Sequence, residues 1–198
     1  MKRVLFCIFV MSLWVSKAQE KWVLDSKKSL IKYEASHFLH DWAGSNENVK
    51  GVLLENDGVF QKIALAMYLR DFDSKNSNRD NNALEILEVL KFPKIEFYSD
   101  QIEMNYDKAI FLGGMSFHGI DLEKKIIAQV TDQKNNLLVK GEFMLTLSDF
   151  QVPLPSFMLR KMEDEILIIC ELYLSLIHIS EPTRQAEISY AVLCVKKK

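Results

Sequence analysis

Two histidines and an aspartate form the sharpest polar cluster in the sequence: His37, His40 and Asp41. Imidazole and carboxylate groups are ligands that zinc prefers, so a metal-assisted enzyme built on these residues is one hypothesis. A zinc site needs a further ligand, and none stands at a recognisable spacing. A short turn with solvated side chains explains the cluster better. We therefore expect no catalytic residues, no metal and no cofactor.

Two further polar residues, His118 and Arg79, have a predicted role. His118, in the stretch MSFHGI, is expected at the end of a strand, where it hydrogen-bonds a loop. Arg79 precedes Asp80, and an acidic residue is favoured at a helix start by the helix dipole. Arg79 could there hold the polar head of a ligand. The sequence contains no Gly-x-Ser-x-Gly and no phosphate-binding loop. These observations favour a binding protein over an enzyme.

The elements that must position these residues are mostly strands. Residues 30–37 (LIKYEASH) and 137–147 (LLVKGEFMLTL) alternate apolar and polar residues, and turn signals such as NDG at 56–58 separate the runs. Alternation with a period of two buries one face of a strand and leaves the other in water. Many short strands of this kind are typical of an all-β sandwich or barrel.

One segment breaks the strand pattern. Within residues 77–93, Leu84 and Leu87 stand at helical spacing, and Ser77 with Asp80 resembles a capping box. Pro93 should stop the helix. The sequence therefore predicts one all-β domain, a single extended lipocalin-like antiparallel barrel of about eight strands. One amphipathic helix is expected between two of those strands.

The amino end has the three parts of a secretory signal. Lys2 and Arg3 precede an uncharged apolar run, and Ser16 and Ala18 stand at the small-residue positions of a cleavage site. The run is short for a membrane span, which needs about 20 residues. We predict cleavage of residues 1–18, a periplasmic or secreted protein, and no tight membrane anchoring.

The last 25 residues do not resemble the rest of the chain. LSLIHISEPTR, beginning at Leu174, resembles the translation of a transposase-type sequencing adapter, and ISYAVLCV continues in the same frame two base changes from its next block. The three final lysines match a run of adenines. We therefore interpret residues 174–198 as a non-native tail and residues 19–173 as the native domain.

Charge and cysteine content exclude some classes of protein. The formal net charge is −2, and the acidic excess is larger within residues 19–173, because the signal and the tail are basic. Without a basic stripe, nucleic-acid binding is not expected, since Lys and Arg supply most of its affinity. Only Cys170 remains in the native domain, so no disulfide can form within the chain.

The order of several segments resembles the YceI-like family. The matching pieces are residues 22–37 (WVLDSKKSLIKYEASH), 74–87, 91–99, 113–120 (GGMSFHGI) and 149–155. The resemblance covers nearly the whole of residues 19–173. It implies a lipocalin-like barrel that holds a long isoprenoid or similar apolar lipid in its interior, with no settled enzymatic activity.

A set of inward-facing residues is the candidate ligand site. The alternation that places Val139 and Phe143 on one face, opposite Lys140 and Glu142, predicts which side chains line the barrel. The candidates are Leu65, Met67, Phe97, Met115, Phe117, Val139, Gly141, Phe143, Leu145, Ile166, Ile168 and Arg79. A metal-assisted enzyme and a ligand-free acidic interaction module stay open as alternatives, and so does a homodimer.

Overall fold

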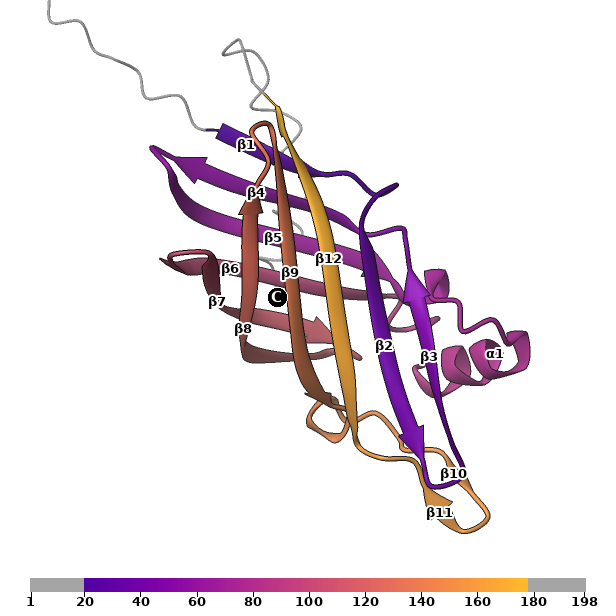
Figure 1. Ribbon diagram of the computed structural model, residues 1–198. Helices are drawn as coiled ribbons and strands as arrows, with labels where there is room; N and C mark the ends of the chain where they lie inside the picture. Colours follow the sequence, from indigo (N-terminus) through magenta and orange to yellow (C-terminus); the bar gives the residue numbers. More distant parts are fainter. Residues whose placement is uncertain (1–19, 178–198) are drawn as a thin grey trace, which may run out of the picture.

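The computed structural model of the protein describes residues 20–177. Figure 1 shows antiparallel strands wrapped into a barrel, with one helix at its side. The strands are β1 (Glu20–Leu24), β2 (Leu30–His37), β3 (His40–Asn46), β4 (Lys50–Asn56), β5 (Val59–Tyr68), β6 (Lys94–Asn105), β7 (Lys108–Phe117), β8 (Ile120–Asp132), β9 (Asn136–Thr146), β10 (Ser156–Phe157), β11 (Arg160–Lys161) and β12 (Glu165–Ile177). The helical elements are η1 (Leu69–Asp71), α1 (Ser77–Ile86) and η2 (Ser148–Phe150).

Eight strands close the barrel. In hydrogen-bonding order they are β1, β4, β5, β6, β7, β8, β9 and β12, and β12 pairs back onto β1. Each of these pairings is antiparallel. The remaining long strands, β2 and β3, form a hairpin that extends from β12. The structure thus confirms the predicted all-β antiparallel barrel with a helix between two strands.

Two strands share one edge of β12, and this opens one end of the barrel. The last part of β12, Leu174–Ile177, pairs with β1, whereas Leu167–Glu171 pairs with β2. Between them the Tyr173 backbone is held by the turn, since its carbonyl accepts the Asp25 N–H at 2.8 Å and its N–H donates to the Ser29 hydroxyl at 3.0 Å. From this point β2 replaces β1 as the neighbour of β12, and the other edge of β2 pairs with β3, whereas β1 pairs with β4.

The two ends of the barrel are filled differently. The end formed by β1, β4 and the last part of β12 is a solid core. Its buried side chains include Trp22, Leu24, Leu53, Ala109, Phe111, Val130, Leu137, Leu172 and Leu174. At the other end, β3 meets the chain after η1 through the isolated bridge Ser45–Asp73. Helix α1 lies beside β3 at this interruption of the wall (Figure 1).

The helix begins and ends differently from the prediction. Its cap is Asn76, whose side-chain oxygen accepts the Arg79 N–H at 3.2 Å, so Ser77 is the first helical residue rather than the cap. The helix ends at Ile86, well before Pro93, and Glu88 has a left-handed φ of 45° just beyond it. In the described part of the chain, no helix is long and apolar enough to cross a membrane.

The segment interpreted as a tail begins inside a strand. Leu174 is fully buried and pairs with Leu24 and Leu137, and the strand continues to Ile177. The expectation that packing stops at Tyr173 is therefore wrong for Leu174–Ile177, because the open edges of β1 and β9 both extend to these residues. Residues 1–19 and 178–198 lie outside the described residues, so the predicted signal and the rest of the predicted tail do too.

Candidate functional site

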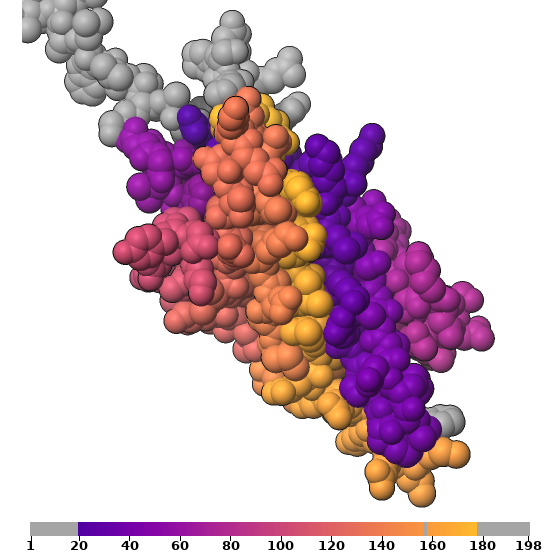
Figure 2. Space-filling view, in the orientation of Figure 1, coloured from indigo at the N-terminus to yellow at the C-terminus, as the bar shows by residue number. Residues whose placement is uncertain are grey.

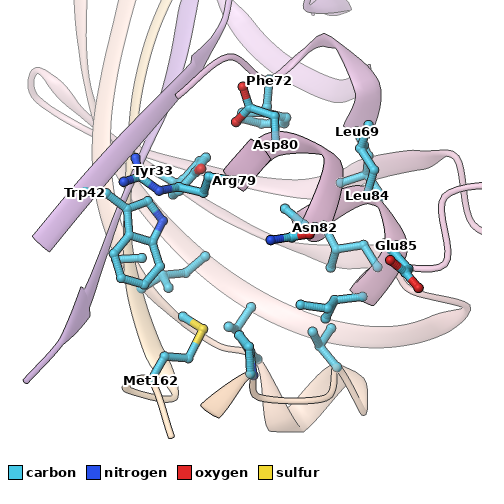
Figure 3. A pocket seen from close by; sticks show the side chains of 18 of the residues that line it. Tyr33, Trp42, Leu69, Phe72, Arg79, Asp80, Asn82, Leu84, Glu85 and Met162 are labelled. Carbon is cyan, nitrogen blue, oxygen red and sulfur yellow. The ribbon is translucent and has the colours of Figure 1, made fainter. Parts of the chain in front are cut away.

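A cavity of about 640 Å³ occupies the open end of the barrel, between the β2–β3 hairpin, helix α1 and the loop that follows η2. Figure 3 shows this space with the residues around it. Its deep part is lined by apolar side chains from five strands and the chain next to them. These are Ala35, Leu69, Ile95, Phe117, Leu145, Leu147, Val152, Ile166 and Ile168.

The rim of the cavity is polar and exposed. Helix α1 and the residue before it contribute Asn76, Asn78, Asn82 and Glu85. His40 of β3 and Ser156 of β10 line the opposite side of the rim and are also exposed. The cavity therefore has an apolar interior that continues to a hydrogen-bonding edge. That distribution suits a molecule with a long apolar body and a small polar end.

An aromatic wall separates the cavity from solvent along the hairpin. Tyr33 and Trp42 lie on one side of the space, with Arg79 of α1 next to them (Figure 3). The Arg79 guanidinium carbon is 5.6 Å from the Trp42 ring centre, and the Tyr33 ring is 5.8 Å from that of Phe72. Burial raises the pKa of Tyr33, and the Asp80 carboxylate adds to this. Tyr33 is consequently a neutral hydroxyl at the edge of the apolar space.

A glycine makes room for this wall. A Cβ atom at Gly44 of β3 would lie 2.5 Å from Cε1 of Tyr33, far inside contact distance. Gly44 is the cross-strand partner of Tyr33, so the ring lies across the strand where a side chain would otherwise stand. Gly44 thereby leaves the space that the Tyr33 ring occupies at the cavity edge.

The amino end of α1 is held by its own side chains. Both oxygens of Asp80 accept the backbone N–H of Ser74, at 3.2 and 3.3 Å, and Asn76 caps the first turn. No residue of α1 is fully buried, although Ala83, Leu84 and Ile86 line the cavity. The helix is thus fixed at its start and covers the cavity with one apolar side.

Five of the predicted ligand residues come together in this cavity. Phe117, Leu145, Ile166 and Ile168 line its deep part, and Arg79 lies at its rim. The other seven do not line the cavity and lie in the packed core or against it. They are Leu65, Met67, Phe97, Met115, Val139, Gly141 and Phe143.

Gly141 lies in a region that is already filled. A Cβ atom at this position would lie 3.1 Å from the Cβ of Ala128 and 3.3 Å from the carbonyl oxygen of Ile127. The prediction that Gly141 lines the ligand site is therefore corrected, since Gly141 does not line the cavity. A residue without a side chain is needed at position 141 because β8 and β9 approach each other closely there.

The histidine cluster does not converge on one point. His37 and His40 face each other across the β2–β3 turn, with ring centres 6.3 Å apart. His37 Nε2 lies 3.2 Å from the Arg160 carbonyl oxygen, and Asp41 accepts the Ser36 hydroxyl at 2.5 Å. Cross-strand pairing places the histidines on one face and Asp41 on the other. The described residues include no group of three metal-binding side chains.

His118 has the role that the sequence predicts. It stands in the β7–β8 turn with a left-handed φ of 51°, and its Nδ1 lies 3.0 Å from the Phe150 carbonyl oxygen. Because a carbonyl only accepts, Nδ1 carries the proton in this contact. His118 thereby joins η2 to the β7–β8 turn.

Several cavity residues were not predicted. These residues belong to β2, β3, the helix, η1 and the residue after it, and the chain between η2 and β12. They are Tyr33, Trp42, Leu69, Phe72, Leu84, Val152 and Met162. The alternation of β2, which puts Tyr33 and Ala35 on one face, carried this signal. The alternation could not predict, however, at which height along the barrel that face of β2 lies.

A closed antiparallel barrel with one hollow, apolar end defines the lipocalin-like class of binding folds. The chain belongs to the YceI-like domain family, whose model matches residues 22–174. No curated protein matches the chain.

Solved structures of the same fold are only distantly similar in sequence. BcnA of Burkholderia cenocepacia has a TM-score of 0.69 at 14% identity, over 76% of this chain and 98% of that chain. A polyisoprenoid binding domain from Saccharophagus degradans has a TM-score of 0.61 at 9% identity, over 81% and 99%. The Campylobacter jejuni YCEI protein has a TM-score of 0.56 at 17% identity, over 66% and 82%. These likenesses show a shared fold.

Proposed function

We propose that this protein is a binding protein, not an enzyme, and that it holds one long apolar lipid of the isoprenoid type. The observation that carries the proposal is the cavity of about 640 Å³, whose deep part is lined by side chains such as Phe117, Leu145 and Ile168. Its volume lies within the range of about 300–1,000 Å³ that is usual for small-molecule sites. Family membership and the polyisoprenoid-binding relative support the same ligand class.

The energetics favour a flexible hydrocarbon chain. Each methylene moved from water into an apolar cavity contributes about 0.8 kcal/mol, so a chain of a few isoprene units binds without directional contacts. The polar end of the lipid then lies at the rim, near Arg79 and Asn82. In this orientation the chain occupies the space next to Ile166 and Leu147, and no charged group is buried.

The predicted location belongs to the same proposal. A periplasmic or secreted carrier would move a water-insoluble lipid through an aqueous compartment, and the amino-terminal sequence pattern supports export. The barrel serves this role because it keeps the apolar chain out of water while the outer faces of the strands stay polar.

Intrinsic fluorescence tests the proposal, because the two described tryptophans lie at opposite ends. Trp42 lines the cavity, whereas Trp22 is buried in the solid core with its Nε1 donating to Glu55 at 2.7 Å. A polyprenol added to protein freed of lipid by unfolding and refolding should change the emission. The change should persist in Trp22→Phe and disappear in Trp42→Phe. No saturable change in the wild type would contradict lipid binding in this cavity.

A further inference from the structure

Two neighbouring loop tips expose large apolar side chains at the cavity end of the barrel. Phe38 and Leu39, in the β2–β3 turn, are each 50% exposed, while Met158 and Leu159, in the β10–β11 turn, are 70% and 103% exposed. Figure 1 shows both turns at the end opposite β1, and Figure 2 shows the two segments together there. Contiguous apolar exposure of this kind marks an interaction surface. We call these four residues the apolar tip.

The two turns are joined into one unit. The Arg160 guanidinium carbon lies 4.8 Å from the Phe38 ring centre, and the Arg160 carbonyl oxygen is 3.2 Å from Nε2 of His37. One step further from the turns, the Glu163 N–H donates to the Ser36 carbonyl at 3.0 Å. The apolar tip is therefore a fixed surface of two connected hairpins.

The β10–β11 turn has a sequence that its backbone does not favour. Met158 and Leu159 have left-handed φ values of 50° and 65°, in a two-residue turn between the paired Phe157 and Arg160. Such turns favour Asn and Gly, because a larger side chain is strained at positive φ. Two bulky apolar residues at these positions oppose both local stability and solubility. Strain retained at an exposed position indicates a role outside folding.

The charged residues next to the apolar tip indicate which kind of partner it contacts. Arg160 and Lys161 follow the turn directly and are both exposed. The carboxylates of Asp41 and Asp164 keep their negative charge, but each is held by a side chain of the protein, since Asp41 accepts from Ser36 and Asp164 from Ser148, each at 2.5 Å. The charged residues that directly adjoin Met158 and Leu159 are therefore the two basic ones. Glu163 stands beyond the two basic residues. Apolar side chains in front of a pair of cations complement the acyl boundary and the phosphates of a phospholipid bilayer.

We infer that the apolar tip docks reversibly on a phospholipid membrane that carries anionic headgroups. Four side chains enter the headgroup boundary, and Arg160 and Lys161 contact phosphate. The cavity reaches His37, His40 and Pro155, which adjoin the tip, so docking brings the cavity rim to the membrane surface. A lipid can then pass between bilayer and barrel without crossing open water. The inference rests on the proposed function only for this last step, since docking itself needs no bound lipid.

Vesicle flotation tests the inference with a variant that should weaken membrane binding without destabilising the fold. Met158→Asn combined with Leu159→Gly gives the turn its favoured residues and removes half of the apolar tip. Leu90→Ser is the matched control, because Leu90 is 99% exposed on the segment between α1 and β6. The vesicles are phosphatidylcholine with phosphatidylglycerol, and phosphatidylcholine alone for comparison.

The full-length wild type and Leu90→Ser should float with the anionic vesicles and bind less to phosphatidylcholine alone. The turn variant should bind the anionic vesicles at least about tenfold more weakly than the wild type, since burial of one Leu or Met side chain accounts for about that factor. Its melting temperature should be equal to or above that of the wild type. Three results would each overturn the inference: no wild-type flotation, equal binding by the turn variant, or wild-type self-association that the turn variant abolishes. Lipid detected in the cavity of all variants would leave the proposed function standing even then.

Discussion

The Arg79 guanidinium carbon lies 5.6 Å from the centre of the Trp42 ring, and this contact joins helix α1 to strand β3 across the rim of the cavity. Between β3 and the chain after η1, the described backbone pairing is limited to the Ser45–Asp73 bridge, so side-chain contacts must hold this part of the wall together. The same contact also covers the aromatic wall with a positive charge. Packing adds to this contact, since Leu84 and Ile86 of α1 are partly buried against the core, although no residue of the helix is fully buried.

Loss of this contact should weaken ligand retention more than it weakens the fold. A cation–π contact at a partly exposed site contributes about 0.5–1 kcal/mol, so Arg79→Ala should lower the affinity for a neutral polyprenol about two- to fivefold. Titration calorimetry measures the affinity. Arg70→Ala is the control, since Arg70 makes the same contact with Tyr68, at 5.0 Å and away from the cavity. Equal affinities in both variants would mean that α1 does not need Trp42.

Filling the cavity should cost little stability, whereas filling the solid core should cost much. Ala35 points into the cavity, and Ala35→Phe should leave the free energy of unfolding within about 1 kcal/mol of wild type. Gly141→Leu should cost about 1–3 kcal/mol, since a Cβ atom there already lies 3.1 Å from that of Ala128. Urea unfolding monitors both. A large loss for Ala35→Phe alone would show that the proposed cavity is packed.

The end of β12 should be essential to the barrel. A chain that stops at Ile177 keeps the pairing of Leu174–Ile177 with β1, and a chain that stops at Tyr173 loses it. Leu174 is fully buried, so the shorter chain should be less stable by about 3 kcal/mol or more. Thermal unfolding of the two truncated proteins gives the comparison. Equal melting temperatures would restore the interpretation that native packing stops at Tyr173.

Cys170 should make the fold sensitive to alkali. Burial raises the pKa of its thiol from 9.0 to about 12, so the folded protein binds the thiol proton more tightly than the unfolded chain does. This contribution to stability is complete below pH 9 and is lost as the pH rises toward 12. The wild type should therefore lose up to ~1.4 kcal/mol per pH unit more than Cys170→Ala in this window. If the free energy of unfolding in urea fell equally with pH in the wild type and in Cys170→Ala, the prediction would be contradicted.

Strand alternation predicted which side chains point inward, and the structure agrees where it can be compared. In β9, Val139, Gly141 and Leu145 are buried, while Lys140 and Glu142 are exposed, as the period of two requires. The apolar spacing of Leu84 and Leu87 likewise predicted a helix in the right place, although Asn76 rather than Ser77 caps it.

The position of the cavity could not be predicted in the same way. Phe97 and Phe117 are both inward-facing aromatic residues, yet only Phe117 lines the cavity. The difference is their height along the barrel axis, which depends on the stagger between strands and not on the alternation within one strand. The hollow end also depends on the change from β1 to β2 as the neighbour of β12 at Tyr173, a long-range pairing that no local pattern encodes.

Native mass spectrometry tests the central claim most directly. The wild type and Ala35→Phe should be purified without detergent and compared with Leu90→Ser, whose substitution lies on an exposed side chain. We predict that the wild type and Leu90→Ser carry an added mass that organic extraction identifies as an isoprenoid-type lipid, in a ratio of one per chain. Ala35→Phe should fold but lose most of that mass. Wild-type protein without added mass, or an equal lipid load in Ala35→Phe, would contradict lipid binding in this cavity.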